Sequence, residues 1–255
     1  MCILYLVWFI IELPYVYARF FMTDGTFMTE LLTFIKQLLF QNTFGASWYI
    51  TASVQAMLLV WFFDRIGKIK MVWILATLFY VLSCMASMYF GYISNTPIED
   101  GIQAISTLAP PVNSFMVAII YMLLGKYIAE HPEGKNNKWY QYLIIFFILG
   151  IAEVIICRKA YRLTDAFIAL VPFTYYLVRI LSSSNVSIPA NVCKYFRASS
   201  TLIYLLHAYI LFYAMSVCKI VQGPLLCVIV MTLAITLSIL VFRLSKKYKL
   251  LKYLY

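Results

Sequence analysis

Charged residues are scarce in this chain of 255 amino acids: they make up 12% of the sequence, whereas hydrophobic residues make up 64% and the mean hydropathy is +0.88. A soluble domain has roughly a quarter charged residues and about half apolar ones. A soluble core cannot enclose so much apolar surface. The sequence therefore predicts an all-α integral membrane protein, because helices satisfy their own backbone hydrogen bonds in lipid.

The sequence also lacks the motifs of common soluble enzymes. It has no glycine-rich phosphate loop, no GxSxG elbow and no HExxH pair. The two histidines, His131 and His207, lie far apart, and the six cysteines form no CxxC pair. We therefore expect no metal site and no disulfide framework, and we interpret the cysteines as small buried hydrophobic residues.

Apolar runs long enough to span a bilayer recur along the chain. A span needs about 20 mostly apolar residues. Eight candidates meet this criterion: 2–21, 46–63, 71–93, 113–130, 139–157, 166–182, 199–218 and 224–243. The first run has no basic segment before it and no small-residue cleavage site after it, which favours a retained span over a signal peptide. We predict a bundle of about eight transmembrane helices over residues 1–245, followed by a basic cytoplasmic tail at 246–255.

Lys and Arg are distributed unequally between the two sides of this predicted bundle. If both termini are cytoplasmic, the cytoplasmic segments hold 14 of the 20 Lys and Arg residues. Such a bias is typical of membrane proteins. We therefore predict a multi-pass protein of the plasma membrane with both termini in the cytoplasm. The net charge of +10 then reports basic loops, and we expect no nucleic acid as a partner.

Three features belong to the predicted membrane interfaces. The 22–45 loop contains 30-ELLTFIKQLLF-40, whose apolar residues share one helical face, as expected for a helix in the interface plane. The 94–112 loop is acidic and rich in proline, and a loop of this length is often functional. Trp48 and Tyr49 open the second span at its outer end, where an aromatic pair is typically an interface anchor.

Histidine is costly within a membrane span, so His207 is a first candidate for function. Tyr204 and Ser200 lie three and seven residues before it, on the same helix face. Such a stripe can bind a polar group or pass a proton. Alternatively, His207 is neutral and hydrogen-bonds a neighbouring helix.

Two carboxylates also lie within predicted spans. Glu12 precedes Pro14 by two residues, and a proline bends a helix and frees a carbonyl group. Glu12 therefore either lines a cavity beside the kink or is protonated or paired within the bundle. Glu153 is expected to form an ion pair with Arg158 or Arg162.

Three stretches together resemble the membrane acyltransferase-3 family. The stretch 45-GASWYITASVQAMLLVWFFDRIGK-68 resembles the WY/WF-x-x-A-L opening of one family span, and 113-NSFMVAIIYMLLGKYIAE-130 resembles its FF-x-x-G-Y-x-x-A span. The stretch 200-STLIYLLH-207 is similar to the S-x-x-I-Y-L-x-H signature near the family's C-terminus. The first span, with 13-LPYVYARF-20, falls where the family's third helix would be, and the order and spacing agree.

This resemblance implies a membrane-bound O-acyltransferase. Members of the family move an acyl group, often acetyl, from a thioester such as acetyl-CoA to a hydroxyl of a cell-envelope glycan or a lipid-linked sugar. The resemblance implies that Ser200, Tyr204 and His207 line the central cavity, with His207 as a supporting group or a substitute base. The substrate-binding residues that we predict are Trp48, Tyr49, Glu12 and Asn113.

The chain departs from the family at its start. Members have about ten spans, and their first helix carries an Arg and a His, the usual candidate for the general base. Arginines suited to the phosphates of the donor follow the second helix. This chain begins with 1-MCILYLVWF-9, within what resembles the third helix. We expect that its true start lies upstream or that it is a truncated product, and that the chain as given is weakly active or inactive.

Two other functions remain open. One is a non-catalytic membrane component of a polysaccharide synthesis or export system. The other is a small-solute transporter, which the lack of an internal repeat argues against.

Overall fold

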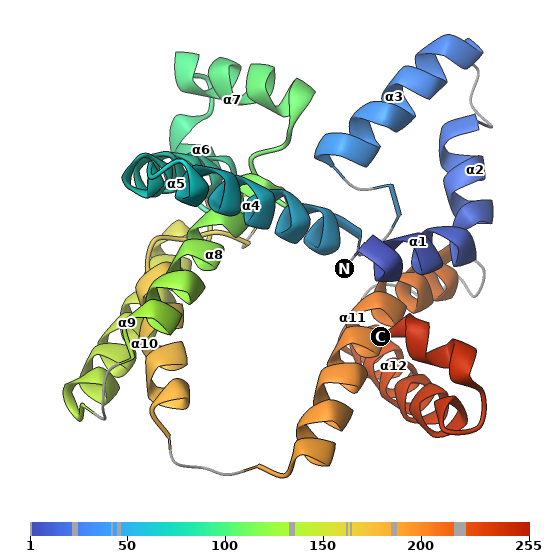
Figure 1. Ribbon diagram of the computed structural model, residues 1–255. Coiled ribbons are helices and arrows are strands. Elements are labelled where there is room, and N and C mark those ends of the chain that lie inside the picture. Colours follow the sequence, from blue (N-terminus) through green and yellow to red (C-terminus); the bar gives the residue numbers. More distant parts are fainter. Residues whose placement is uncertain are drawn as a thin grey trace. The chain divides into compact units, whose positions relative to one another are not determined.

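The computed structural model is built from helices (Figure 1). It describes residues 2–21, 25–41, 43–44, 47–132, 136–161, 163, 165–184, 188–216 and 223–255, without the side chains of residues 18–20 and 216. No strand occurs within these ranges, and every regular element there is a helix. The all-α prediction is therefore confirmed.

The chain forms two compact units. Unit 1 comprises residues 1–35, 42–50 and 186–255, and unit 2 comprises residues 36–41 and 51–185.

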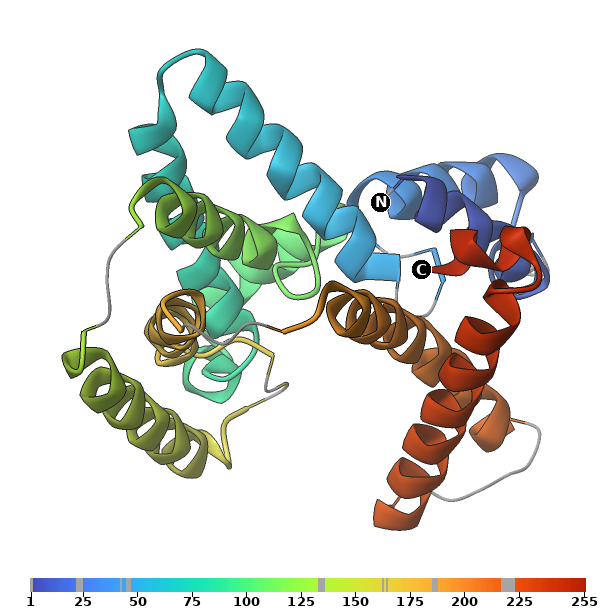
Figure 2. The same cartoon turned by 60° about the horizontal axis from the view of Figure 1, so that its bottom comes forward.

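Unit 1 is organised around the long helix α11. Its elements are α1 (Cys2–Ile11), α2 (Leu13–Phe21), most of α3 (Phe27–Phe40), the first turn of α4 (Ser47–Arg65), α11 (Ala190–Ser216), α12 (Pro224–Ser245) and the 3₁₀ helix η1 (Lys249–Leu254). Helices α11 and α12 lie side by side in both views (Figures 1 and 2). The larger buried cluster of this unit consists of Trp8, Val16, Phe44, Ile50, Leu202 and Leu205.

The first predicted span is interrupted at Glu12, between α1 and α2. Pro14 has no N–H group, so it cannot donate the helical hydrogen bond to the carbonyl of Ile10. The backbone of Glu12 still bonds on both sides, from its N–H to the Trp8 carbonyl at 2.9 Å and from the Val16 N–H to its own carbonyl at 3.0 Å. The predicted proline bend therefore divides the span into two short helices.

The basic tail turns back onto the helices of its own unit (Figure 2). The indole N–H of Trp8 donates to the carbonyl of Leu254 at 3.1 Å. The hydroxyls of Ser245 and Tyr255 are hydrogen-bonded at 2.8 Å. These contacts join η1 to α1 and to the end of α12.

Unit 2 contains the remaining helices. They are the rest of α4, α5 (Ile69–Ala86), α6 (Phe90–Ile93), α7 (Pro97–Leu108), α8 (Phe115–Glu130), α9 (Lys138–Cys157) and α10 (Leu170–Ser182). The main core lies where α5 packs against α8, and α9 pairs with α10. The predicted 94–112 loop contains the helix α7, and the predicted interface helix at 30–40 is the larger part of α3.

Four helices in the described ranges are long and apolar enough to cross a bilayer: α5, α9, α11 and α12. This finding supports a membrane protein but not eight spans. Helices α1, α8 and α10 have 10, 16 and 13 residues. At about 1.5 Å per residue, 13 residues cover about 20 Å of a hydrocarbon layer that is about 30 Å thick. Helix α4 is long enough but less apolar, because it contains Ser, Thr and Gln residues.

The predicted pairing of Glu153 with Arg158 is wrong. The Glu153 carboxylate instead accepts hydrogen bonds from the backbone amides of Ile168 and Ala169, at 2.7 and 3.0 Å, and from the hydroxyl of Tyr89. The chain that follows α9 turns back and brings the unbonded amides at the start of α10 to this carboxylate. The alternative partner, Arg162, lies outside the described residues.

Candidate functional site

A cavity of about 350 Å³ in unit 1 brings two of the predicted motifs together. It lies between α1, the first turn of α4 and α11. Its lining residues are Leu4, Tyr49, Ile50, Ser200, Thr201, Tyr204 and Leu205. Ser200 and Tyr204 come from the C-terminal motif, and Tyr49 comes from the predicted aromatic pair. The cavity therefore combines hydroxyl groups with an apolar wall.

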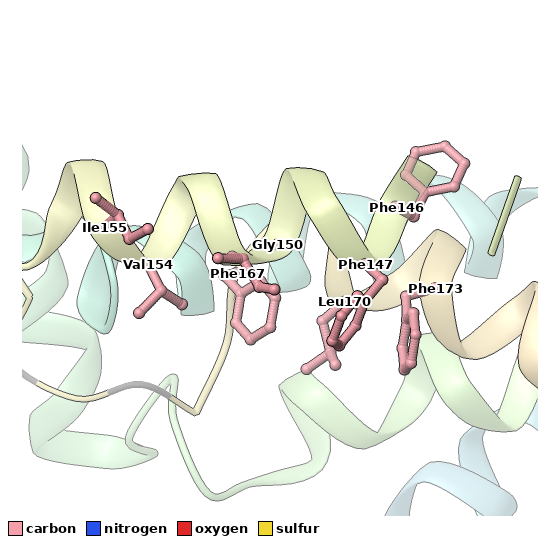
Figure 3. A pocket seen from close by; sticks show the side chains of 9 residues that line it. Phe146, Phe147, Gly150, Val154, Ile155, Phe167, Leu170 and Phe173 are labelled. Carbon is pink, nitrogen blue, oxygen red and sulfur yellow. The ribbon is translucent and has the colours of Figure 1, made fainter. Parts of the chain in front are cut away.

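Another cavity, between α9 and α10 in unit 2, is a weaker candidate for chemistry (Figure 3). Its volume is about 320 Å³, and its side chains are all aliphatic or aromatic. Gly150 lies in its wall, with the ring of Phe167 close to it. None of the side chains that line it can take up a proton or stabilise a developing negative charge.

Ser200 and Thr201 are bonded back to their own helix. Both hydroxyls donate to the carbonyl oxygen of Arg197, at 3.0 Å each. This local pattern is common for hydroxyl side chains in helices within membranes. It uses the proton of each hydroxyl and leaves the oxygen lone pairs free to accept a hydrogen bond from a ligand.

Tyr204 contributes a phenol hydroxyl to the wall of the cavity. Its hydroxyl oxygen is buried and has no hydrogen-bond partner in the part of the chain that the structure describes. Its ring packs edge-to-face against Tyr49, with centroids 5.4 Å apart. A buried phenol normally finds a partner. An unsatisfied phenol in the wall of the cavity is a candidate partner for a bound polar group.

His207 lies one turn further along α11 and is not among the lining residues. Its Nδ1 is 2.5 Å from the carbonyl oxygen of Tyr204, and the two rings are 5.6 Å apart. A carbonyl oxygen can only accept, so this contact assigns the proton to Nδ1. In the neutral form of this tautomer the lone pair lies on Nε2, which is the arrangement that a general base requires.

The other predicted site residues are dispersed. Trp48 is half-buried, and its ring is 6.0 Å from that of Tyr49. Glu12 is only 5% exposed, but it does not line the cavity. Asn113 belongs to unit 2, where it directly precedes Ser114, the N-cap of α8, and has a left-handed backbone with φ of 59°.

The cavity brings together residues from different predicted spans. Eight alternating spans place Tyr49 near the outer surface and Ser200 near the inner one. In the structure both residues line one cavity, together with Leu4. Helix α1, which contributes Leu4 to the cavity, has only 10 residues and is shorter than the 20-residue span predicted there.

Some lining residues were missed by the sequence reasoning. Leu4, Ile50 and Leu205 are ordinary apolar residues, and nothing in their pattern marks them as part of a site. Thr201 could have been found, because it lies four residues after Arg197 and three before Tyr204, on the same helix face. Within the described ranges no three His, Cys, Asp or Glu residues are grouped as metal ligands would be.

A match to a known family covers almost the whole chain. The family described as an acyltransferase domain, acyltransferase-3, matches residues 1–243. A curated amino-acid racemase of Enterococcus faecalis is 21% identical over 170 residues, which cover 65% of this chain. The match covers only 23% of the racemase, so the chain spans a minor part of that relative. No solved structure matches the chain.

Proposed function

Because this chain belongs to the acyltransferase-3 family, we propose that it acts in O-acyl transfer at the plasma membrane. The donor is an acyl-CoA, with acetyl-CoA as the first candidate. The acceptor is a hydroxyl of a cell-envelope glycan or of a lipid-linked sugar. The observation that carries the proposal is the buried Tyr204 hydroxyl, which has no partner among the described residues and belongs to the wall of a cavity that Ser200 also lines.

The reaction needs a base and a group that stabilises an oxyanion. The acceptor oxygen attacks the thioester carbonyl, the C–S bond breaks, and the acceptor proton finally reaches the thiolate of CoA. General-base assistance typically contributes 10²–10⁴ in rate, and a hydrogen-bond donor at the oxyanion contributes about 10²–10³. In this proposal the Nε2 atom of His207 takes the proton, and the Tyr204 hydroxyl donates to the carbonyl oxygen.

The orientation is part of the same proposal. We place both termini in the cytoplasm, where the donor is available, and we infer that the shorter apolar helices add crossings to the four long ones. The distribution of Lys and Arg supports this orientation.

A second candidate function is the binding of a small solute. It is favoured by Glu12, a buried carboxylate at a helix break with no side-chain partner among the described residues. Broken helices with polar groups at membrane depth are typical of transporters.

The test is the release of free CoA from acetyl-CoA by purified protein in lipid, with a crude glycan acceptor. The chain and any longer in-frame form are compared, together with H207A. If the acceptor stimulates release and H207A abolishes it, the proposal stands. If only the longer form reacts and H207A has no effect on it, another residue is the base. If no form releases CoA, the acyltransferase proposal fails. Uptake of radiolabelled solutes into proteoliposomes by the parent, but not by E12Q, would then support the transporter.

A further inference from the structure

The basic residues of the C-terminal part have no acidic counterparts in the sequence. Asp165 is the last acidic residue, whereas Lys and Arg continue to Lys252. Many of these basic side chains gather where α11 begins and α12 ends, because the ring of Tyr195 packs at 4.8 Å against that of Phe242. The exposed basic residues of this end are Lys194, Arg197, Arg243, Lys246, Lys247, Lys249 and Lys252.

Lys194 and Arg197 differ from the other members of this group in their position. They lie on the α11 face that continues through Thr201 to Tyr204, at spacings of three and four residues. Arg197 is also joined to the cavity residues through its carbonyl, which accepts hydrogen bonds from Ser200 and Thr201. At about 1.5 Å per residue, Arg197 precedes Tyr204 by about 10 Å along the helix.

The remaining basic residues have a different setting. Lys249 and Lys252 alternate with Leu250 and Tyr253, which are 80% and 54% exposed. An exposed segment that mixes cations with large apolar side chains fits the surface of an anionic bilayer. These residues therefore serve as matched basic controls from the same unit.

We propose that Lys194 and Arg197 bind the phosphate groups of the acyl-CoA donor, whose thioester end extends along α11 into the cavity at Ser200 and Tyr204. This assignment rests on the proposed function. The guanidinium of Arg197 offers a planar pair of donors to a phosphate, and Lys194 adds a mobile point charge. Neither cation is paired with a carboxylate in the part of the molecule that the structure describes.

The experiment measures binding of free CoA to the full chain by titration calorimetry in nanodiscs of neutral phosphatidylcholine. The variant K194Q/R197Q is compared with the parent, with K249Q/K252Q and with R197K. Pantetheine, which lacks every phosphate, is the second probe. We expect K194Q/R197Q to weaken CoA binding roughly tenfold or more. The control pair should stay within about threefold of the parent, and K194Q/R197Q should leave pantetheine binding unchanged. R197K should bind CoA with an affinity between those of the parent and K194Q/R197Q, because a lysine keeps the charge but not the planar pair of donors.

Several outcomes overturn the assignment. Equal losses in both double variants would show that the protein attracts CoA only through diffuse charge. Parent-like CoA binding by K194Q/R197Q would exclude these residues even if acyl transfer proceeds, so the proposed function would stand without them. In a further outcome, the K194Q/R197Q variant copurifies with less phosphatidylglycerol than the parent but binds CoA with the same affinity. The site would then hold lipid headgroups. Binding of CoA that depends on the pair, without any acyl transfer, would uphold this assignment while the proposed function fails.

Discussion

The Glu153 carboxylate accepts a hydrogen bond of 3.0 Å from the backbone amide of Ala169, the residue before α10. It also accepts one of 2.7 Å from the amide of Ile168. Amides at the start of a helix have no acceptor within the helix. A single side chain of α9 thus supplies the acceptors that hold the start of α10, and it links two helices in a part of unit 2 that is rich in apolar residues.

Replacement of Glu153 by Ala should destabilise unit 2, because it leaves two backbone amides without acceptors. We expect the free energy of unfolding to fall by about 1–3 kcal/mol. Glu153→Gln keeps one acceptor oxygen and should cause a smaller loss. The measurement is thermal unfolding in nanodiscs. Glu130→Gln is the control, since Glu130 is exposed and, among the described residues, its ion-pair partner is Lys126. Equal midpoints for E153A and E130Q would contradict this role.

Tyr204→Phe should lower acyl transfer without lowering the stability of the fold. The Tyr204 hydroxyl is buried and has no partner in the described part of the chain, so its removal should leave the unfolding midpoint unchanged or higher. If the hydroxyl assists acyl transfer, turnover should fall by about 10²-fold or more. The matched control is Tyr80→Phe, because the Tyr80 hydroxyl donates to the Phe167 carbonyl at 2.9 Å. Y80F should lower stability and leave turnover per folded molecule unchanged. Parent-like turnover of Y204F would remove Tyr204 from the mechanism.

Gly91→Ala should be poorly tolerated. The N–H of Gly91 donates to the carbonyl of Ala160 at 2.5 Å, and a Cβ atom at residue 91 would come within 2.6 Å of the Ala160 Cα. The two backbones must separate to admit it, at a cost of about 1–3 kcal/mol in unfolding free energy. Gly101→Ala in α7 is the control, because no atom lies within 4 Å of its added Cβ. G101A should be neutral or stabilising by up to about 1 kcal/mol. Thermal unfolding of both variants decides the comparison.

Arg179→Lys should destabilise the ends of α8, α9 and α10. The Arg179 side chain is only 2% exposed, and its guanidinium lies 5.6 Å from the ring centre of Tyr127 and 6.0 Å from that of Trp139. It donates to the Tyr175 hydroxyl at 3.2 Å and to the His131 carbonyl. A lysine keeps the charge but cannot reach both acceptors. We expect a loss of about 1.5–3 kcal/mol, the range for a hydrogen bond to a charged group.

The control for this substitution is Arg65→Lys. Arg65 is exposed and lies 5.7 Å from the ring centre of Trp61. Chemical or thermal unfolding should not distinguish R65K from the parent. If R179K also unfolded like the parent, the stability of this region would not depend on the guanidinium of Arg179.

Composition and pattern were sufficient to predict the class of the protein and several of its helices. The apolar runs at 139–157 and 224–243 correspond to α9 (Lys138–Cys157) and α12 (Pro224–Ser245). These predictions succeed because charged residues, Gly and Pro bound the runs, and because a helix is the only open-chain structure that satisfies its backbone in lipid. The interruption beside Pro14 was predictable for an equally local reason, the missing N–H group.

Only the tertiary structure decided which distant residues meet. The contact of Trp8 with Leu254 spans 246 positions of the chain, and the cavity joins Tyr49 to Tyr204. The partners of Glu153 are backbone amides, which no side-chain pattern identifies. Apolar helices in lipid present similar surfaces on all sides, so hydropathy contains no information on which faces pack together. Close packing and the satisfaction of polar groups make that selection, and both depend on the folded arrangement.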